Sequence, residues 1–267
     1  MNTRHKVIKK GKLRFERFIE AQKEANEKLL PITHTTDAYD LGDIIENGEI
    51  RPRPCDVLDH DLSYFFYGRP AYRKNSEIQA NNLAAYAPIV LIFKSTVSDK
   101  AIAAFPFDSG AFKGEMYSEF THHRMAVQDF GLQPSHRTIG KLVAFFFGTN
   151  SRYYNQNPRA KRSIQADEFE AQTYQELVTF RGKNQRDDRS TTVELLLDEC
   201  LKLQDNLLAV IVPSSMIKDR AVKAKLSNLD VHIRSYTDGA NLTPASQVPL
   251  LSDVVRHFYI EQGILEK

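Results

Sequence analysis

Two continuous apolar runs constrain the fold of this chain more than any other feature. The runs are APIVLIFKS at 87–95 and NLLAVIVP at 206–213, and both are rich in β-branched side chains. A short run in which nearly every residue is apolar is typical of a strand that is buried on both faces of a sheet. The sequence therefore predicts two buried strands, and any fold proposed for the chain must enclose them.

Weaker patterns around these runs predict the remaining elements. Further strands are expected at 30–36, 63–68, 191–197 and 230–236, with the strand at 191–197 adjacent to that at 206–213. Helices are expected at 13–30, 38–47, 136–147, 214–226 and 250–262. Because helices and strands alternate irregularly, we expect an α+β fold. Residues 1–30 are predicted to form a basic amphipathic helical segment that precedes a single domain at 31–267.

Composition narrows the class of protein. The chain has 267 residues, of which 42% are hydrophobic, and its mean hydropathy is −0.43. No apolar run approaches the roughly 18 residues that a membrane span requires, and no apolar segment follows the basic start as in a signal peptide. Two cysteines are too few for a disulfide framework or a four-thiolate zinc site. We expect a cytoplasmic protein without a metal and without a membrane partner.

Basic residues are concentrated in three stretches although the net charge is only +2. The stretches are residues 4–17, NPRAKR at 157–162 and RGKNQRDDR at 181–189. They are either solvated surface or a rim that contacts the phosphates of a nucleic acid. Composition does not decide between these two interpretations.

The segment THTTDAYDLGDIIENGEIRP at 33–52 is the first candidate for a binding site. His34 and Thr35 stand at a predicted strand end, just before a capped helix that stops at Gly48. An imidazole both donates and accepts hydrogen bonds, so it can hold a ribose hydroxyl or an amide. The alternative is a core histidine with structural partners, next to an N-cap.

The segment LSYFFYGRPAYR at 62–73 is the second candidate. In a strand, Tyr64 faces one side and Tyr67 the other, and the turn at Gly68 lets Arg69 and Tyr72 curl over the strand end. Aromatic rings stack on flat cationic or heteroaromatic groups, and arginine clamps phosphate. The pattern indicates a site for a planar ring and an anionic group, or a core strand followed by surface arginines.

A third candidate, RSTTVELLL at 189–197, places Glu194 within a predicted core strand. A carboxylate there is costly unless it is paired or lines a cleft. Rival carboxylates are Glu168, Glu170 and Glu176, of which Glu170 could belong to an exposed strand. FPFDSGAF at 105–112 is interpreted as a rigid turn, either near the cleft or merely structural.

In chain order, the three candidates resemble the ADP-ribosyltransferase superfamily, especially DarT-type toxins that modify nucleic acids. The resemblance is carried by His34 and Thr35, by the helix with Leu41, Ile44 and Gly48, by FYGRP at 66–70, and by the strand with Glu194. Arginine and proline are reversed relative to the DarT pattern at 69–70. The similarity covers roughly 30–70 well and 187–217 weakly.

The resemblance implies a split β-sheet with peripheral helices and NAD as the donor of ADP-ribose. His34 would bind the ribose next to the nicotinamide, and the backbone near Thr35 would hold its carboxamide. Tyr67 or Tyr64 would stack on the nicotinamide, Tyr72 would form a second wall, and Arg69 would contact the diphosphate or orient the acceptor. Glu194 would stabilise the sugar cation and accept the acceptor's proton.

The expected protein is thus a bacterial toxin or phage-defence effector that modifies RNA or DNA. A protein acceptor and an antitoxin partner stay open. The alternatives are an RNA 2′-phosphotransferase of the same superfamily, and a non-catalytic module that binds nucleotides or nucleic acid.

Overall fold

The fold belongs to the mixed α+β class and is described by a computed structural model. It covers residues 13–24, 27–72, 84–180, 188–239 and 242–266. The chain forms two compact units, of which unit 1 comprises 1–30, 52–67 and 98–199, and unit 2 comprises 31–51, 68–97 and 200–267. The basic residues at 4–12, and most of the third basic stretch, lie outside the described residues.

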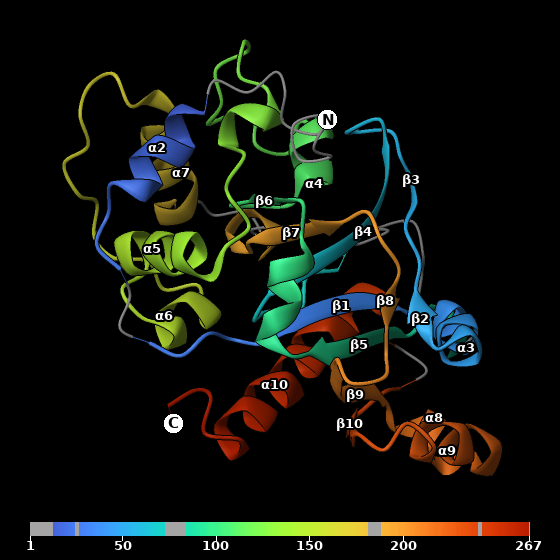
Figure 1. The fold of residues 1–267 in the computed structure, drawn as a ribbon. Helices are drawn as coiled ribbons and strands as arrows, with labels where there is room; N and C mark the ends of the chain where they lie inside the picture. Colours follow the sequence, from blue (N-terminus) through green and yellow to red (C-terminus); the bar gives the residue numbers. More distant parts are fainter. Residues whose placement is uncertain (1–12, 25–26, 73–83, 181–187, 240–241, 267) are drawn as a thin grey trace. The chain divides into compact units, whose positions relative to one another are not determined.

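Unit 1 combines a small antiparallel sheet with helices. Its strands are β3 (Arg53–Cys55), β4 (His60–Tyr67), β6 (Ala103–Phe105) and β7 (Glu194–Leu197). Its helices are α2 (Arg14–Glu20), α4 (Ser109–Lys113), α5 (His136–Phe146), α6 (Asn150–Tyr154) and α7 (Phe169–Thr179). Strand β7 lies between β4 and β6, and β3 pairs with β4. Helix α2 packs against both α5 and α7 (Figure 1).

Unit 2 contains the two apolar runs at 87–95 and 206–213. Its strands are β1 (Ile32–Asp37), β2 (Glu49–Ile50), β5 (Pro88–Phe93), β8 (Leu201–Lys202), β9 (Leu207–Pro213) and β10 (His232–Tyr236). Its helices are α3 (Ala38–Asn47), α8 (Ser214–Lys218), α9 (Arg220–Ser227) and α10 (Pro244–Glu261). Strand β5 pairs antiparallel with β1 and β9, and β9 pairs parallel with β10.

The strands predicted from the apolar runs are confirmed as core strands. Every residue of β5 is buried, and so is every residue of β9 except Leu208. Helix α10 packs on β5, β9 and β10 and covers this sheet (Figure 1). The predicted adjacency of 191–197 and 206–213 is wrong, since β7 pairs with β4 and β6 whereas β9 pairs with β5 and β10. Both segments are apolar enough for any buried position, and apolarity does not specify the neighbour.

The junction between β1 and α3 follows its local sequence signals. The side chain of Asp37 accepts a hydrogen bond from the backbone N–H of Asp40 at 3.1 Å, which caps the helix. Gly48 ends it with φ of 67°, a left-handed conformation that favours glycine. The predicted helix at 38–47 is confirmed, and its cap fixes how the chain leaves the strand that carries His34.

Two predicted helices differ in extent from the sequence pattern. The helix expected at 13–30 ends at Glu20, because no apolar residue after Ile19 continues its buried face until Leu29. The helix expected at 214–226 is divided into α8 and α9 at Asp219, whose carboxylate caps α9 through the N–H groups of Ala221 and Val222. In both places local polar residues interrupt the helix, although the spacing of apolar residues predicts a longer one.

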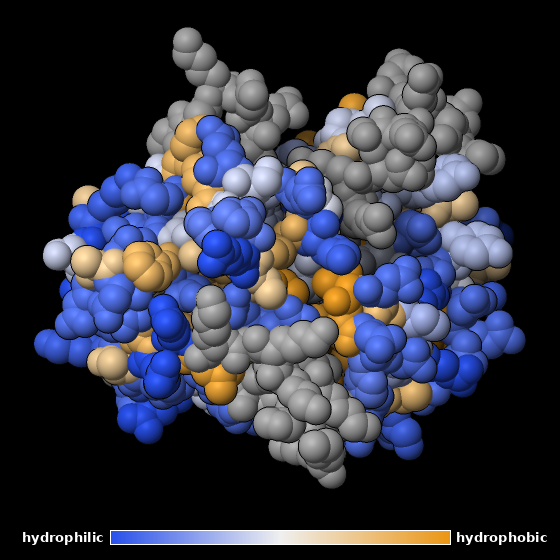
Figure 2. All heavy atoms as spheres, turned by 90° about the horizontal axis from the view of Figure 1, so that it is seen from above, coloured by the Kyte–Doolittle hydropathy of each residue, from blue (hydrophilic) through white to orange (hydrophobic). Residues whose placement is uncertain are grey.

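Apolar side chains are concentrated in the two sheets and the helices that cover them. On the face shown in Figure 2, hydrophilic residues make up most of the coloured surface and hydrophobic residues occur in small groups. Among the described residues, no helix combines the length and apolarity needed to cross a bilayer.

Candidate active site

The residues that the sequence singles out fall in both units. Tyr64, Tyr67 and Glu194 belong to unit 1, whereas His34, Thr35, Arg69 and Tyr72 belong to unit 2.

Glu194 begins β7 and is buried in the middle of the sheet of unit 1. It lies opposite Phe66 of β4 on one side and Phe105 of β6 on the other. Its side chain is only 1% exposed, and its Oε2 accepts a hydrogen bond from the backbone N–H of Ser109 at 3.1 Å. The strand that carries the glutamate is thus paired directly with the tyrosine-rich strand, although the two are far apart in the sequence.

Asp108 supplies a second buried carboxylate next to Glu194. Its Oδ1 caps helix α4 by accepting from the N–H of Ala111 at 2.6 Å, and this turn presents the N–H of Ser109 to Glu194. Arg189 lies beside the pair, with its Nη1 3.9 Å from Oδ2 of Asp108. The backbone N–H of Asp108 also donates to the carbonyl of Arg189 at 3.2 Å. FPFDSGAF therefore forms the wall of the Glu194 environment.

This environment controls the charge of Glu194. Burial, followed by repulsion from Asp108, raises the pKa of Glu194 well above its usual 4.5. Hydrogen bonding from Ser109 and attraction to Arg189 oppose the shift without cancelling it. A carboxylate with a raised pKa is a stronger base than an ordinary one, which favours a role as a general base. Perturbed carboxyl groups of this kind are enriched at functional sites.

Tyr64 faces the same side of the sheet as Glu194, while Tyr67 faces the other. Burial, a hydrogen bond to Cys55, and the negative charges of Glu194 and Asp108 raise the pKa of the Tyr64 hydroxyl. That hydroxyl donates to the Sγ of Cys55 at 2.5 Å. The sequence contains no spacing signal for Cys55, because the contact depends on the pairing of β3 with β4.

Tyr67 is 2% exposed and is occupied by contacts within unit 1. Its hydroxyl accepts from the N–H of Leu30 at 3.1 Å and donates to Oδ1 of Asn150 at 3.2 Å. Its ring packs on Tyr153 with centroids 5.5 Å apart. Of the two tyrosines considered for stacking, Tyr64 is therefore the one with a partly exposed ring on the Glu194 side.

In unit 2, His34 and Thr35 lie in the middle of β1. They stand opposite Leu91 and Val90 of β5, and both side chains are half-buried. The hydroxyl of Thr35 is buried without a hydrogen-bond partner among the described residues. A half-buried imidazole next to an unsatisfied hydroxyl is suited to binding a polar ligand.

The turn after β4 runs along β1. Gly68, with φ of 67°, donates its N–H to the carbonyl of Pro31 at 2.8 Å and accepts from the hydroxyl of Tyr259 at 2.9 Å. The carbonyl of Arg69 accepts from the hydroxyl of Thr33 at 2.9 Å, and the Arg69 side chain is buried. These bonds fix the backbone of the Gly-Arg-Pro turn.

Tyr72 lies close to the acidic start of α3. Burial, and then the charges of Asp37 and Asp40, raise the pKa of its hydroxyl. Asp40 itself accepts from the hydroxyl of Thr36 at 3.1 Å. Carboxylates disfavour a phosphate here but accept hydrogen bonds from sugar hydroxyls.

The rival carboxylates occupy different surroundings. Glu170 lies in helix α7, so the exposed strand considered for it is wrong, and its Oε2 is buried without a hydrogen-bond partner among the described residues. Glu176 is exposed and forms an ion pair with Lys161, and Glu168 lines a surface pocket of unit 1. In the described part of the chain, no group of three or more His, Cys, Asp or Glu side chains could hold a metal ion.

Among known proteins, no protein-family model and no curated protein matches the chain.

Proposed function

We propose that this protein is an NAD-dependent ADP-ribosyltransferase with a split-sheet fold of that superfamily, and that Glu194 is its catalytic carboxylate. The observation that carries the proposal is the buried carboxyl pair of Glu194 and Asp108. Glu194 lies on the strand next to that of Tyr64, and Asp108 caps α4 beside it. Burying two carboxyl groups beside one arginine lowers stability, and such an arrangement is typical of residues retained for chemistry.

The chemistry requires a fixed anion more than an acid. In NAD the bond from C1′ of the ribose to the nicotinamide nitrogen breaks, and its electron pair leaves with the neutral nicotinamide. C1′ becomes an oxocarbenium-like cation, which an acceptor oxygen or nitrogen attacks while losing a proton. The ionised carboxylate of Glu194 stabilises the cation and accepts that proton, and the positive charge of the nicotinamide ring favours this ionised form.

The other site residues take the roles that the resemblance assigns to them. Tyr64 provides the stacking surface for nicotinamide, since the Tyr67 hydroxyl and ring are engaged in internal contacts. His34 binds the ribose, and the backbone around Thr35 holds the carboxamide. Tyr72 forms the second wall, and Arg69 contacts the diphosphate or orients the acceptor. The acceptor we propose is RNA or DNA, as expected for a bacterial toxin or phage-defence effector, for which an antitoxin is a further candidate partner.

Transfer of label from NAD tests the proposal. Purified protein is incubated with NAD labelled in the adenylate phosphate and a cell lysate, which is then separated into protein, RNA and DNA. We expect label in a nucleic-acid fraction and a loss of about 10²–10⁴-fold in rate for Glu194→Gln. This substitution keeps the size of the side chain, and circular dichroism verifies that the variant is folded.

Glu176→Gln and Glu170→Gln are the matched controls, because both remove a carboxylate from unit 1 without touching β7. They should keep the wild-type rate. The proposal fails if no nicotinamide is released, or if Glu170→Gln abolishes transfer while Glu194→Gln does not.

A further inference from the structure

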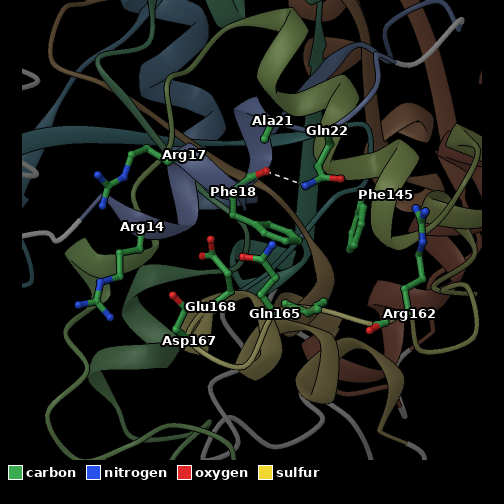
Figure 3. A pocket seen from close by; sticks show the side chains of 12 residues that line it. Arg14, Arg17, Phe18, Ala21, Gln22, Phe145, Arg162, Gln165, Asp167 and Glu168 are labelled. Atoms are coloured by element: carbon green, nitrogen blue, oxygen red, sulfur yellow. Dashed lines mark hydrogen bonds between the residues drawn. The ribbon is translucent and has the colours of Figure 1, made fainter.

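A surface pocket of unit 1 lies outside the Glu194 cluster and shares no residue with it. Its volume is about 760 Å³, within the range of about 300–1,000 Å³ common for ligand pockets. Helix α2 contributes Arg14, Arg17 and Phe18, helix α5 contributes Phe145, and the segment before α7 contributes Arg162 and Gln165 (Figure 3).

The pocket brings two basic stretches of the sequence together. Arg14 and Arg17 end the first stretch and Arg162 ends the second, and Figure 3 shows their guanidinium groups on opposite sides of the pocket. All three arginines are exposed, and no described residue forms an ion pair with them. Three unpaired guanidinium groups around one concavity favour an anionic ligand with several charges.

Aromatic side chains form the floor between these charges. Phe18 is half-buried and packs edge to face on Phe145, with ring centroids 5.1 Å apart. The guanidinium of Arg162 lies over the Phe145 ring, 4.5 Å from its centroid. Phe145 is buried, whereas the half-buried ring of Phe18 and the guanidinium plane of Arg162 are surfaces on which nucleobases can stack.

The wall that carries Arg162 is held in place by α7. The side-chain amide of Gln175 accepts from the N–H of Arg162 at 2.8 Å and donates to its carbonyl at 2.9 Å. The side of the pocket formed by α2 is fixed to α5 by the ion pair of Lys141 and Glu20 at 3.0 Å. The arginines are therefore presented from anchored backbone.

Two carboxylates in the lining distinguish between candidate ligands. Asp167 and Glu168 oppose an acidic peptide, because they repel its negative side chains and leave only its backbone N–H groups as donors. Single-stranded nucleic acid has phosphates for the arginines and amino groups on its bases for the carboxylates and for Gln165. A duplex presents those amino groups only within its grooves, and it does not fit a pocket of this size.

We propose that this pocket binds a single-stranded segment of RNA or DNA, with Arg14, Arg17 and Arg162 on its phosphates and Phe18 against a base. The inference deepens the proposed function, on which it rests, by taking this strand as the acceptor.

Fluorescence anisotropy with a labelled mixed-sequence eight-nucleotide DNA, and with the matching RNA, tests the site without NAD. Arg14→Gln/Arg17→Gln should weaken binding by roughly tenfold or more. It should also reduce the slope of log K against log salt by about 1.4, because each of the two lost phosphate contacts contributes about 0.7 to the slope for a single strand. Phe18→Leu keeps the apolar packing but removes the ring, and it should weaken binding with no change in salt slope.

Arg220→Gln/Lys223→Gln is the matched control, because it removes two positive charges from exposed positions on α9 in unit 2. Equal weakening by both double variants overturns the proposal, as does unchanged binding by Arg14→Gln/Arg17→Gln. Tighter binding of duplex DNA or of poly-glutamate than of the single strand overturns it as well. Nicotinamide release by the wild-type protein is measured separately without oligonucleotide, so failure of the pocket and failure of the transferase give different results.

Discussion

Glu194 and Asp108 place two carboxyl groups in one buried cluster that contains a single arginine. Each carboxylate makes the ionisation of the other less favourable, and Arg189 compensates only part of this repulsion. Ser109 connects the two, because the turn capped by Asp108 is also the turn that donates an N–H to Glu194. The charge of the proposed catalytic group is thus set by a residue that need not contact the substrate.

Asp108→Asn tests this coupling through the pH dependence of the reaction. Asparagine still caps α4 but removes the negative charge, so the raised pKa of Glu194 should fall towards 4.5. Because Glu194 acts in its ionised form, the acidic limb of kcat/KM for nicotinamide release should move to lower pH. Arg189→Gln should move that limb to higher pH, since Arg189 lowers the pKa. If the acidic limb of the kcat/KM profile stays at the same pH in both variants, the limb does not report the ionisation of Glu194.

Among the elements, helix α2 is joined to α5 by the polar contacts of Glu20. Glu20 binds both Thr138 and the buried ammonium of Lys141, which is 4% exposed. Together with nearby positive charge, these partners lower the pKa of Glu20, although burial opposes the shift. A lowered pKa means that the interaction stabilises the fold above the ordinary pKa of 4.5, and that this contribution is lost as the pH falls through the folded value.

Glu20→Ala should therefore lower the free energy of unfolding by about 1–2 kcal/mol at neutral pH, because it leaves Thr138 and Lys141 without their carboxylate partner. This loss of stability is smaller than for a fully buried ion pair, since 41% of the Glu20 side chain is exposed. Urea denaturation at pH 7 and at pH 3.5 measures the effect, which should shrink at the lower pH. Glu24→Ala is the control, because its ion pair with Arg137 is exposed on both sides and should contribute under about 1 kcal/mol.

Local signals in the sequence predicted the elements better than their arrangement. The helix α3 could be bounded from Asp37 and Gly48 alone, since each acts on its own backbone. The neighbours of β7 could not be inferred, because several segments are equally apolar and only the assembled sheet selects among them. Asp108 lies beside Glu194 because of that assembly. Arg14 and Arg162 line the same pocket because of helix packing.

On the scale of the whole molecule, the two units are interleaved along the chain. The chain passes from one unit to the other after Leu30, Arg51, Tyr67, Val97 and Glu199. Neither unit is a continuous stretch, and β5 in particular requires β9 from the far end of the sequence as its partner.

A fragment of residues 1–199 contains all of unit 1 but lacks β9, β10 and α10. It should not give a stable fold, because β5 would expose an apolar edge and lose the helix that covers it. We expect aggregation, or a loss of the cooperative thermal transition seen by circular dichroism for the full chain. A monomeric fragment that melts cooperatively would show that unit 1 folds without the rest.

This interleaving has a consequence for how the protein is made. A ribosome releases the chain from its N-terminus, so His34 emerges while β9 and β10 are still untranslated. The strand that carries His34 pairs with β5, and β5 remains unpaired on its other edge until residues 207–213 have been synthesised. A nascent chain therefore cannot complete unit 2. For a protein proposed to modify nucleic acid, activity would begin only after these last strands have been translated.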